Sequence, residues 1–563
     1  MKSLFASRSR PPGLIRLRYM PAIAASRMAG RESGIPACPR DLISIGLALV
    51  LTLTSFNTLA QAAFDTTSLD HELDTAVARY HLPGVAVGVV KDGEVIYRGT
   101  RGELEIGGGQ RVDSGSLFKI ASNSKAMTAA LLGRLVDQGK LRWDDPVSKH
   151  LPDFQMQQDW VTREIQVRDL LIHNSGLPAG AGDLMLWPEP NHFTRADVLH
   201  GMRYLKPKWS FRSRYAYDNT LYIVAGEVAA AVGGAPYETL MRREVFEPLG
   251  LSRCRVGAWS LEATGNVAQP HRLRDGRYEV VNRDPANIPE STMAAAGGVR
   301  CSLDDMLKWA STWLQPDRVG VQADGKPWLS DAQREAIWMA QQPMPLSSRM
   351  RRWDDSHFYA YGYGWRLSDV DGTARMAHTG TLSGMYSSFT LLPEKHIGIV
   401  VLINGDADEA RTVLMQALTR HFTAPDDNPG VEGYAKWLAD ERTQAVEQSP
   451  SRIPDTRDRR PAAPTELAGK LGRWRDPWFG DVTICPLQGE VRFAAAKSPR
   501  VRGQVMTTRH GWLVDWDGDA VSEAWLRFGP GNGLTMAKLD PDGDFSDDFE
   551  DLDFHRVGDC PAK

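Results

Sequence analysis

The chain has 563 residues, of which 42% are apolar and 24% are charged, so it has enough apolar material for a large core. This length corresponds to about three to four domain-lengths as a soft prior. The formal net charge of −4 argues against a nucleic-acid-binding role, because such proteins usually carry a strongly basic domain.

The beginning of the chain is typical of an export signal. Arginines crowd the first forty residues, and the apolar run 42–51 leads to the small-residue site Ala60-Gln61-Ala62. This pattern predicts a secretory signal cleaved before Ala63. The run is shorter than the roughly 20 residues of a membrane-spanning helix, although an uncleaved anchor remains the alternative. The basic lead is unusually long, which suggests a true start at Met20 or Met28. A secreted or periplasmic protein without stable membrane insertion is expected.

From Ala63 onward, strand and helix patterns alternate in an order that predicts an α+β fold. A helix is expected over 69–80, and Lys91-Asp92-Gly93 predicts a hairpin because Asp-Gly favours tight turns. A mostly helical region then runs from 116 to about 314. Strands are expected on both sides of it, at 84–90, 94–98, 360–367, 375–379, 387–392 and 397–403. Such strands predict one antiparallel sheet built from both ends of the domain.

The composition and the predicted secondary structure of the chain change after His421. A connecting helix is expected over 433–446, and 449–464 is rich in Pro, Arg and Asp, as is typical of a linker. Seven or so short alternating segments follow, which predict a small all-β barrel or sandwich: 481–485, 490–494, 504–508, 511–516, 524–528, 534–539 and 552–557. The predicted division is 1–62 leader and signal peptide, 63–425 α+β domain, 426–464 linker and 465–563 C-terminal β-barrel domain.

Two compositional features stand out in the C-terminal domain. Its tryptophans are expected to pack in the core, with a ligand pocket as the alternative; they are Trp474, Trp478, Trp512, Trp516 and Trp525. The acidic run 540–553 is interpreted as a solvated hairpin. A calcium loop is disfavoured, because the glycine stands at the wrong position and no helices flank it.

Four cysteines remain once the leader is removed with Cys38. An even number in an oxidising compartment predicts disulfides. Cys254–Cys301 and Cys485–Cys560 are the expected pairs, since each lies within one proposed domain; free buried thiols are the alternative. No C-x-x-C or H-E-x-x-H motif is present, so neither a metal nor another cofactor is expected.

The motif Ser122-Asn123-Ser124-Lys125 precedes the apolar run 126–136, which predicts a buried helix. Residues at i and i+3 share a helix face with Cβ atoms roughly 5–6 Å apart, so Ser122 and Lys125 can touch. A desolvated lysine favours its neutral, proton-accepting form, which would activate the serine as a nucleophile. The motif is common by chance, however, and Ser122 could simply cap the helix.

Two further motifs follow in the order that a serine–lysine site would need. Tyr217-Asp218-Asn219 lies just before an apolar helix expected over 223–232, and His378-Thr379-Gly380 ends a predicted strand. A loop before a helix can present a phenol and an amide to a cleft. A glycine at a strand edge lets a substrate pair with the backbone. Each motif alone is more often structural, so their joint order carries the argument.

The ordered set S-x-x-K, Y-x-N and [KH]-[TS]-G resembles the serine hydrolases of class C β-lactamase type. That family includes penicillin-binding DD-peptidases, D-aminopeptidases and esterases. The short segments 138–141, 170–177 and 296–298 also resemble sequences common in this family, and the resemblance covers 69–404. It implies a β-lactamase/DD-peptidase-like domain. The C-terminal domain resembles a lipocalin-like β module often appended to this family, where it would cap the cleft or mediate oligomers.

The resemblance implies roles for the matched residues. Ser122 would attack a carbonyl and form an acyl-enzyme, while Lys125 and Tyr217 would share the proton transfers, with the general base left unassigned. The backbone N–H groups of Ser122 and Thr381 would form the oxyanion hole. Asn219 would bind a substrate amide or the Lys125 amine.

Together with Asn219, the expected substrate-binding residues are His378, Thr379, Gly380 and Thr381. Relatives that hydrolyse β-lactams carry lysine where this chain has His378, and histidine is largely neutral near pH 7. Weak recognition of a substrate carboxylate and poor penicillin hydrolysis are therefore expected.

The sequence thus predicts a secreted, cofactor-free serine hydrolase that cleaves amide bonds of D-amino-acid peptides, as a D-aminopeptidase or a DD-peptidase-like carboxypeptidase does. A carboxylesterase or weak β-lactamase on the same site is the first alternative. A penicillin-recognising sensor that is acylated without turnover is the second. The expected partners are a small peptide or ester, with no nucleic acid and with a homo-oligomer as an open option.

Overall fold

The computed structural model describes residues 65–448 and 452–562. The predicted leader and signal peptide, 1–62, lies outside the described residues. Across the described ranges, no helix combines the length and the apolar character that crossing a bilayer requires.

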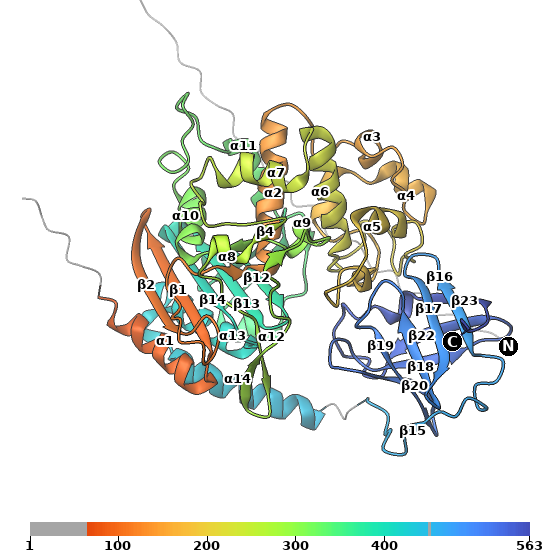
Figure 1. Cartoon of the computed structure of the whole chain (residues 1–563). Coiled ribbons are helices and arrows are strands. Elements are labelled where there is room, and N and C mark those ends of the chain that lie inside the picture. Colours follow the sequence, from red (N-terminus) through yellow and green to blue (C-terminus); the bar gives the residue numbers. More distant parts are fainter. Residues whose placement is uncertain (1–64, 449–451, 563) are drawn as a thin grey trace, which may run out of the picture. The chain divides into compact units, whose positions relative to one another are not determined.

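An antiparallel sheet joins the two ends of the α+β domain, as the sequence predicts. β1 pairs with β14, with Val85 opposite Ile403, and the strand order is β2-β1-β14-β13-β12-β11-β10-β9 (Figure 1). The strands are β1 Gly84–Lys91, β2 Glu94–Gly102, β9 Gln342–Pro343, β10 Tyr359–Tyr361, β11 Arg366–Val370, β12 Thr373–Leu382, β13 Met385–Leu392 and β14 Ile397–Ile403. Two-stranded pairs lie outside this sheet, at β3 Phe118–Lys119 with β8 Arg300–Cys301, β4 Trp259–Ser260 with β7 Asn287–Ile288, and β5 His271–Arg274 with β6 Arg277–Val280.

The prediction of a single strand over 360–367 is wrong. The chain turns between β10 and β11, and Gly364 adopts a left-handed conformation with φ of 76°. A Cβ at that glycine would lie 2.6 Å from the Lys125 carbonyl oxygen, so the turn packs directly against the helix that carries the serine–lysine motif.

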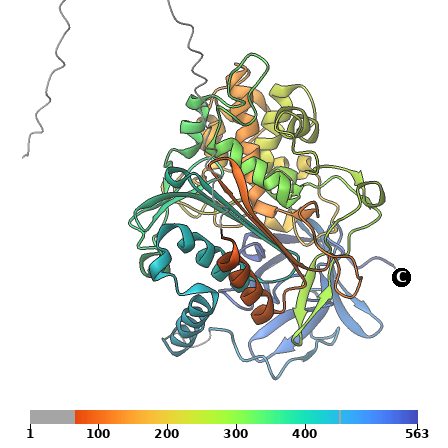
Figure 2. The same ribbon diagram turned by 90° about the vertical axis from the view of Figure 1, so that its left-hand side faces the viewer.

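Helices cover both faces of the sheet, and Figure 2 shows the sheet between the two layers. On one face, α1 and α13 pack against the sheet, and α14 packs against α1 and α13 within the same apolar core. On the other face lie α10 and then α2 and α6. The longer helices are α1 Thr67–Tyr80, α2 Ser124–Asp137, α6 Thr220–Gly233, α10 Leu303–Leu314, α13 Asp408–Thr423 and α14 Gly430–Gln448; the shorter ones are α3 Val147–His150, α4 Asp159–Glu164, α5 Arg195–Gly201, α7 Tyr237–Met241, α8 Leu261–Thr264, α9 Ala294–Gly297, α11 Asp331–Trp338 and α12 Ser348–Trp353.

The helix α14 corrects the interpretation of the segment after His421. Val431, Tyr434 and Leu438 are buried against the α1–α13 layer, and the Val431 N–H donates to Glu72 Oε2 at 2.7 Å. The first half of the predicted linker is therefore part of the helical layer. The domain boundaries themselves stay predictions.

The C-terminal segment forms a closed eight-stranded barrel. The strands run β19-β18-β17-β16-β23-β22-β21-β20, and β19 also pairs with β20, while the short β15 (Arg460–Pro461) adds to β19. The bounds are β16 Gly472–Asp476, β17 Gly480–Leu487, β18 Glu490–Ala495, β19 Arg502–Thr508, β20 Gly511–Trp516, β21 Ala524–Phe528, β22 Gly533–Lys538 and β23 Asp553–Gly558. The sequence prediction missed β16, where arginines alternate with buried residues.

Two expectations for the barrel have different outcomes. Core packing is confirmed for four of the five tryptophans, which are buried: Trp474, Trp478, Trp516 and Trp525. The solvated acidic hairpin is wrong, because Asp547 and Asp548 are buried, with 9% and 4% of their surfaces exposed. The acidic run instead contains the 3-10 turn Phe549–Asp551.

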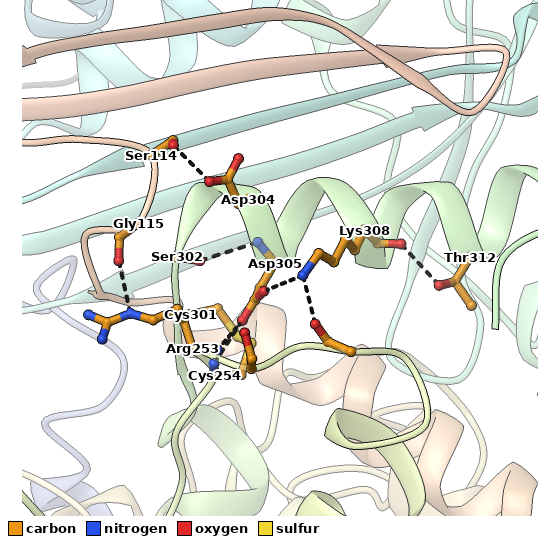
Figure 3. Close-up of polar contacts among 12 residues, drawn as sticks. Ser114, Gly115, Arg253, Cys254, Cys301, Ser302, Asp304, Asp305, Lys308 and Thr312 are labelled. Carbon is orange, nitrogen blue, oxygen red and sulfur yellow. Dashed lines mark hydrogen bonds and ion pairs between the residues drawn. A yellow bond between two sulfur atoms is a disulfide. The ribbon is translucent and has the colours of Figure 1, made fainter. Parts of the chain in front are cut away.

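Both predicted disulfides are present, which excludes the alternative of free thiols at these positions. Cys485–Cys560 closes a loop of the barrel, and Cys254–Cys301 lies at the start of α10 (Figure 3). There, Asp305 Oδ2 accepts hydrogen bonds from the Arg253 and Cys254 N–H groups at 2.6 and 2.9 Å. The N-terminus of α10 is thus fastened to the preceding loop by one covalent and two polar contacts.

Candidate active site

The serine–lysine motif lies at a sharp entry into α2. Ala121 has a φ of 49°, which is unusual for a residue with a side chain, and the 3-10 turn Ala121–Asn123 leads into the helix. Ser122 is partly exposed, whereas Lys125 is fully buried. Lys125 Nζ lies 3.1 Å from Ser122 Oγ, so the contact expected from the i, i+3 spacing is confirmed.

The amine of Lys125 is surrounded by hydrogen-bond acceptors. Besides Ser122 Oγ, Nζ donates to Asn219 Oδ1 at 2.7 Å and to the Ala296 carbonyl at 2.8 Å. The rings of Tyr217 and Tyr222 also face it, with centroids at 4.9 and 5.2 Å. The role of the Ala-Gly-Gly phrase at 296–298 is therefore to present a backbone oxygen to the lysine.

Tyr217 meets the same serine from the other side. Its hydroxyl donates to Ser122 Oγ at 2.9 Å. Its loop is held by His173, whose Nδ1 accepts the Asp218 N–H at 3.1 Å and whose ring centroid lies 4.3 Å from that of Tyr217. The sequence analysis noted the phrase at 170–177 but assigned it no role; the structure makes it the support of the tyrosine.

Asn219 occupies the N-cap position of α6 and is almost fully buried. Its Oδ1 accepts from Lys125, and its Nδ2 donates to Asp183 Oδ2 at 2.9 Å. Of its two expected partners, Asn219 therefore contacts the lysine amine. Asp183 was not predicted from the sequence, because nothing in its local pattern distinguishes it from an ordinary turn residue.

β12 presents a strand edge beside the serine. β11 pairs with β12 only as far as Ala377, while β13 accompanies β12 from Met376 to Leu382. Among the strands of the described chain, none covers the other edge of β12 from His378 onward. Pairing of an extended substrate with Thr379 and Gly380 along this edge stays a prediction.

Gly380 brings β12 against the turn that carries the serine. A Cβ at Gly380 would lie 2.1 Å from the Ile120 carbonyl oxygen and 2.3 Å from Ser387 Oγ. The segments of Ser122 and Thr381, whose N–H groups are the expected oxyanion hole, are therefore in contact. Arg411 fixes the second segment by donating to the Gly380 carbonyl and to Thr381 Oγ1 at 2.9 and 2.8 Å.

His378, which was expected to contact substrate, is buried in the protein. Only 1% of its surface is exposed, and both ring nitrogens have partners: Tyr361 at Nε2 (2.8 Å) and the Thr379 carbonyl at Nδ1 (2.7 Å). Burial, followed by the charges of Arg366 and Lys125, holds the pKa of His378 well below its usual value. The ring is thus neutral near pH 7, as expected. Its burial does not support direct contact with substrate.

A cation that the sequence analysis missed lies beside the same motif. The guanidinium of Arg366, at the start of β11, donates to Thr379 Oγ1 at 2.7 Å. Its Nε is buried without a hydrogen-bond partner, and within the described ranges no carboxylate forms an ion pair with it. No local motif marks this arginine, because its proximity to Thr379 follows from strand pairing.

Residues 69–422 match the family model described as Beta-lactamase. The chain belongs to the β-lactamase family. Its fold and its family make it a serine hydrolase, related to proteins named as penicillin-binding proteins, peptidases and β-lactamases.

Three similar proteins illustrate the range of the family. Unguisins hydrolase ungD' of Aspergillus campestris is 27% identical over 72% of this chain and 75% of its own length. Penicillin-binding protein 4 of Amycolatopsis lactamdurans is 28% identical over 61% and 86%. The D-alanyl-D-alanine-carboxypeptidase/endopeptidase AmpH of Escherichia coli is 25% identical over 65% and 91%.

A solved structure shares the fold across both domains. The octameric penicillin-binding protein homologue from Pyrococcus abyssi superposes with a TM-score of 0.56 at 20% identity, covering 87% of this chain and 99% of that one. At this identity the likeness concerns the fold alone.

Proposed function

We propose that this protein is an exported serine peptidase that forms an acyl-enzyme on Ser122 and cleaves amide bonds in peptides containing D-amino acids. The observation that carries the proposal is the position of Ser122 Oγ between Lys125 Nζ at 3.1 Å and Tyr217 Oη at 2.9 Å. A serine hydroxyl within reach of two groups that can exchange its proton is the arrangement of an activated nucleophile.

The proposed reaction has two steps. Ser122 Oγ attacks the carbonyl carbon, its proton passes to the Lys125–Tyr217 pair, and the pair delivers a proton to the departing amine. Water then attacks the ester carbonyl and loses a proton to the same pair; the bond to Ser122 Oγ breaks, the acid leaves, and the pair returns the proton to Oγ, which restores the serine. The N–H groups of Ser122 and Thr381 would stabilise the oxyanion in both steps.

Arg366 favours substrates with a free carboxylate. Its guanidinium reaches Thr379 on the open strand edge and has no ion-pair partner among the described residues. A half-buried cation without a counter-charge is costly, and arginine binds carboxylates with two parallel hydrogen bonds. The expectation of weak carboxylate recognition considered His378 alone; with Arg366 beside Thr379, we propose that the site recognises a substrate carboxylate.

The similarity to a D-alanyl-D-alanine-carboxypeptidase/endopeptidase supports D-amino-acid peptides as the substrate class. Two disulfides support an oxidising compartment. A carboxypeptidase-like activity therefore fits better than an aminopeptidase activity, because the unpaired guanidinium of Arg366 would attract a substrate carboxylate and repel a substrate ammonium group.

The decisive test of the proposed function combines acylation with turnover. A fluorophosphonate should label the wild-type protein at Ser122, as identified by peptide mass spectrometry, and should not label Ser122→Ala. A panel of D-alanyl and L-alanyl peptides, aryl esters and penicillins then separates the peptidase from an esterase, a β-lactamase and a sensor. Faster turnover of esters than of any peptide, or a penicillin adduct on Ser122 that persists without peptide turnover, contradicts the proposal.

The carboxylate preference has its own test. Arg366→Gln should raise KM for a D-alanyl-D-alanine peptide with a free carboxylate about 10- to 100-fold, since hydrogen bonds to charged groups contribute roughly 1.5–3 kcal/mol. The same peptide with a C-terminal amide should respond much less. Arg366→Lys keeps the charge, so its KM for the acid peptide should lie between those of the wild type and of Arg366→Gln. Equal losses for acid and amide substrates would contradict the assignment.

A further inference from the structure

A loop of the C-terminal barrel lies against the candidate active site. We name residues 544–548, between β22 and the turn at 549–551, the barrel loop. The Phe545 ring packs edge-on against Tyr217 at a centroid distance of 5.9 Å. The Phe545 carbonyl approaches Gly180 so closely that a Cβ there would lie 2.3 Å from it. The Gly182 N–H donates to Asp548 Oδ2 at 2.6 Å.

The same loop is connected to Lys125 through a short chain of hydrogen bonds. Ser546 Oγ donates to Asp183 Oδ2 at 2.8 Å. That oxygen also accepts from Asn219 Nδ2 at 2.9 Å, and Asn219 Oδ1 accepts from Lys125 Nζ at 2.7 Å. Two residues thus separate a hydroxyl of the barrel from the amine that contacts Ser122.

Asp183 depends on these two donors. It is fully buried, and its Oδ1 has no hydrogen-bond partner. Burial raises the pKa of Asp183 well above its usual value; the hydrogen bonds from Asn219 and Ser546 oppose this, the nearby Asp218 adds to it, and Lys125 opposes it. Asp548, on the barrel loop, is a second buried carboxyl close enough to interact with Asp183.

We infer that the barrel loop completes the active site, with Ser546 as a positioning residue that acts on Lys125 through Asp183 and Asn219. The inference rests on the proposed function, because it concerns the readiness of Ser122 to be acylated. Asp183 Oδ2, by accepting from both donors, keeps the Asn219 amide turned so that Oδ1, not Nδ2, faces the lysine.

Loss of the Ser546 hydroxyl should make Asp183 easier to protonate. Removing a hydrogen bond that lowers the pKa of Asp183 lets that pKa rise further. An Asp183 that carries its proton on Oδ2 becomes a donor at the atom that now accepts from Asn219, which favours a turned amide with Nδ2 against Lys125 Nζ, donor against donor. The lysine would then lose an acceptor, and acylation would slow at low pH first.

The experiment uses the full chain and measures, across pH, the rate at which a fluorophosphonate reacts with Ser122, where Oγ attacks phosphorus and displaces fluoride. Ser546→Ala should react about tenfold more slowly near neutral pH, and the acid limb of its pH profile should move to higher pH. Ser546→Thr keeps a hydroxyl and should recover most of the rate. Thr535→Ala, which removes an exposed hydroxyl from β22, should match the wild type.

The outcomes separate the two proposals. If the wild-type protein is not labelled at Ser122, the proposed function fails. If it is labelled, and Ser546→Ala reacts at the wild-type rate with an unshifted acid limb, the positioning role is overturned. A uniform loss in Ser546→Ala with a lowered melting temperature and no shift of the acid limb also overturns it, since a merely structural role gives that result.

Discussion

At the scale of single residues, the site depends on how closely two backbones approach. Gly380 lies against the Ile120 carbonyl, two residues before Ser122, at a separation that leaves no room for a methyl group. The glycine of the H-T-G motif therefore does more than open the strand edge to substrate. It allows β12 to touch the turn that carries the serine, so both halves of the expected oxyanion hole belong to one packed unit.

Gly380→Ala should lower acylation of Ser122 at least 100-fold, because the new Cβ would displace a backbone oxygen and not a flexible side chain. The rate at which a fluorophosphonate labels Ser122 and the melting temperature of the variant test this. Gly533→Ala is the matched control, since a Cβ there meets open space. Near-wild-type acylation of Gly380→Ala would show that the turn can move aside without consequence.

The residue types at the site were readable from the sequence, but their partners were not. Ser122, Lys125 and Tyr217 carry a recognisable order, and the i, i+3 spacing sets the first contact. Asp183 and Arg366 lie in segments without any motif. They reach the site because the 3-10 turn Asp183–Met185 and β11 pack beside it, and pairing of distant segments is a property of the folded chain.

At the scale of elements, α14 decides how the α+β domain ends. Its apolar residues recur at helical spacing and are buried against α1 and α13, so it thickens the helical layer on that face of the sheet. The sequence pattern predicted the helix but not its role, because an amphipathic helix does not reveal which surface it covers.

Leu438→Ala on α14 should therefore lower the free energy of unfolding by about 2–4 kcal/mol, as expected for a buried leucine. Val446→Ala, on the exposed end of the same helix with 71% of the side chain accessible, should change it by less than about 0.5 kcal/mol. Chemical denaturation of both variants at neutral pH measures the difference. Equal small effects would mean that α14 is the connector that the sequence suggested.

At the scale of the whole molecule, buried carboxyl groups link the barrel to the rest of the chain. Asp548 accepts from Gly182, and Asp551 lies next to it. Burial raises the pKa of Asp551 to about 6, with Lys206 opposing and Glu550 and Asp476 adding to the shift. Because the folded-state pKa exceeds the unfolded value, this group favours the folded state at low pH, and the contribution is lost as pH rises through about 6.

Asp551→Asn should consequently gain stability relative to the wild type as pH rises from about 4 to above 6, by up to about 3 kcal/mol. Unfolding free energies of both proteins at pH 4.5 and 7.5 test the sign. Glu490→Gln, which alters an exposed carboxylate of the barrel, should show no such pH-dependent gain. An Asp551→Asn variant that is more stable than the wild type at pH 4.5 but not at pH 7.5 would contradict this prediction.

The sequence by itself determined the α+β class, the terminal barrel, both disulfide pairs and the ordered motifs of the site. These features depend on local periodicity, on turn chemistry and on side chains whose role in the proposed reaction few other residue types could fill. Only the tertiary structure decided that Asp547 and Asp548 of the acidic run are buried, that His378 is buried, and that Arg366, Asp183 and Ser546 lie near the serine. Each of these depends on which distant segments pack together, and burial and partner choice are set by that packing and not by the local pattern.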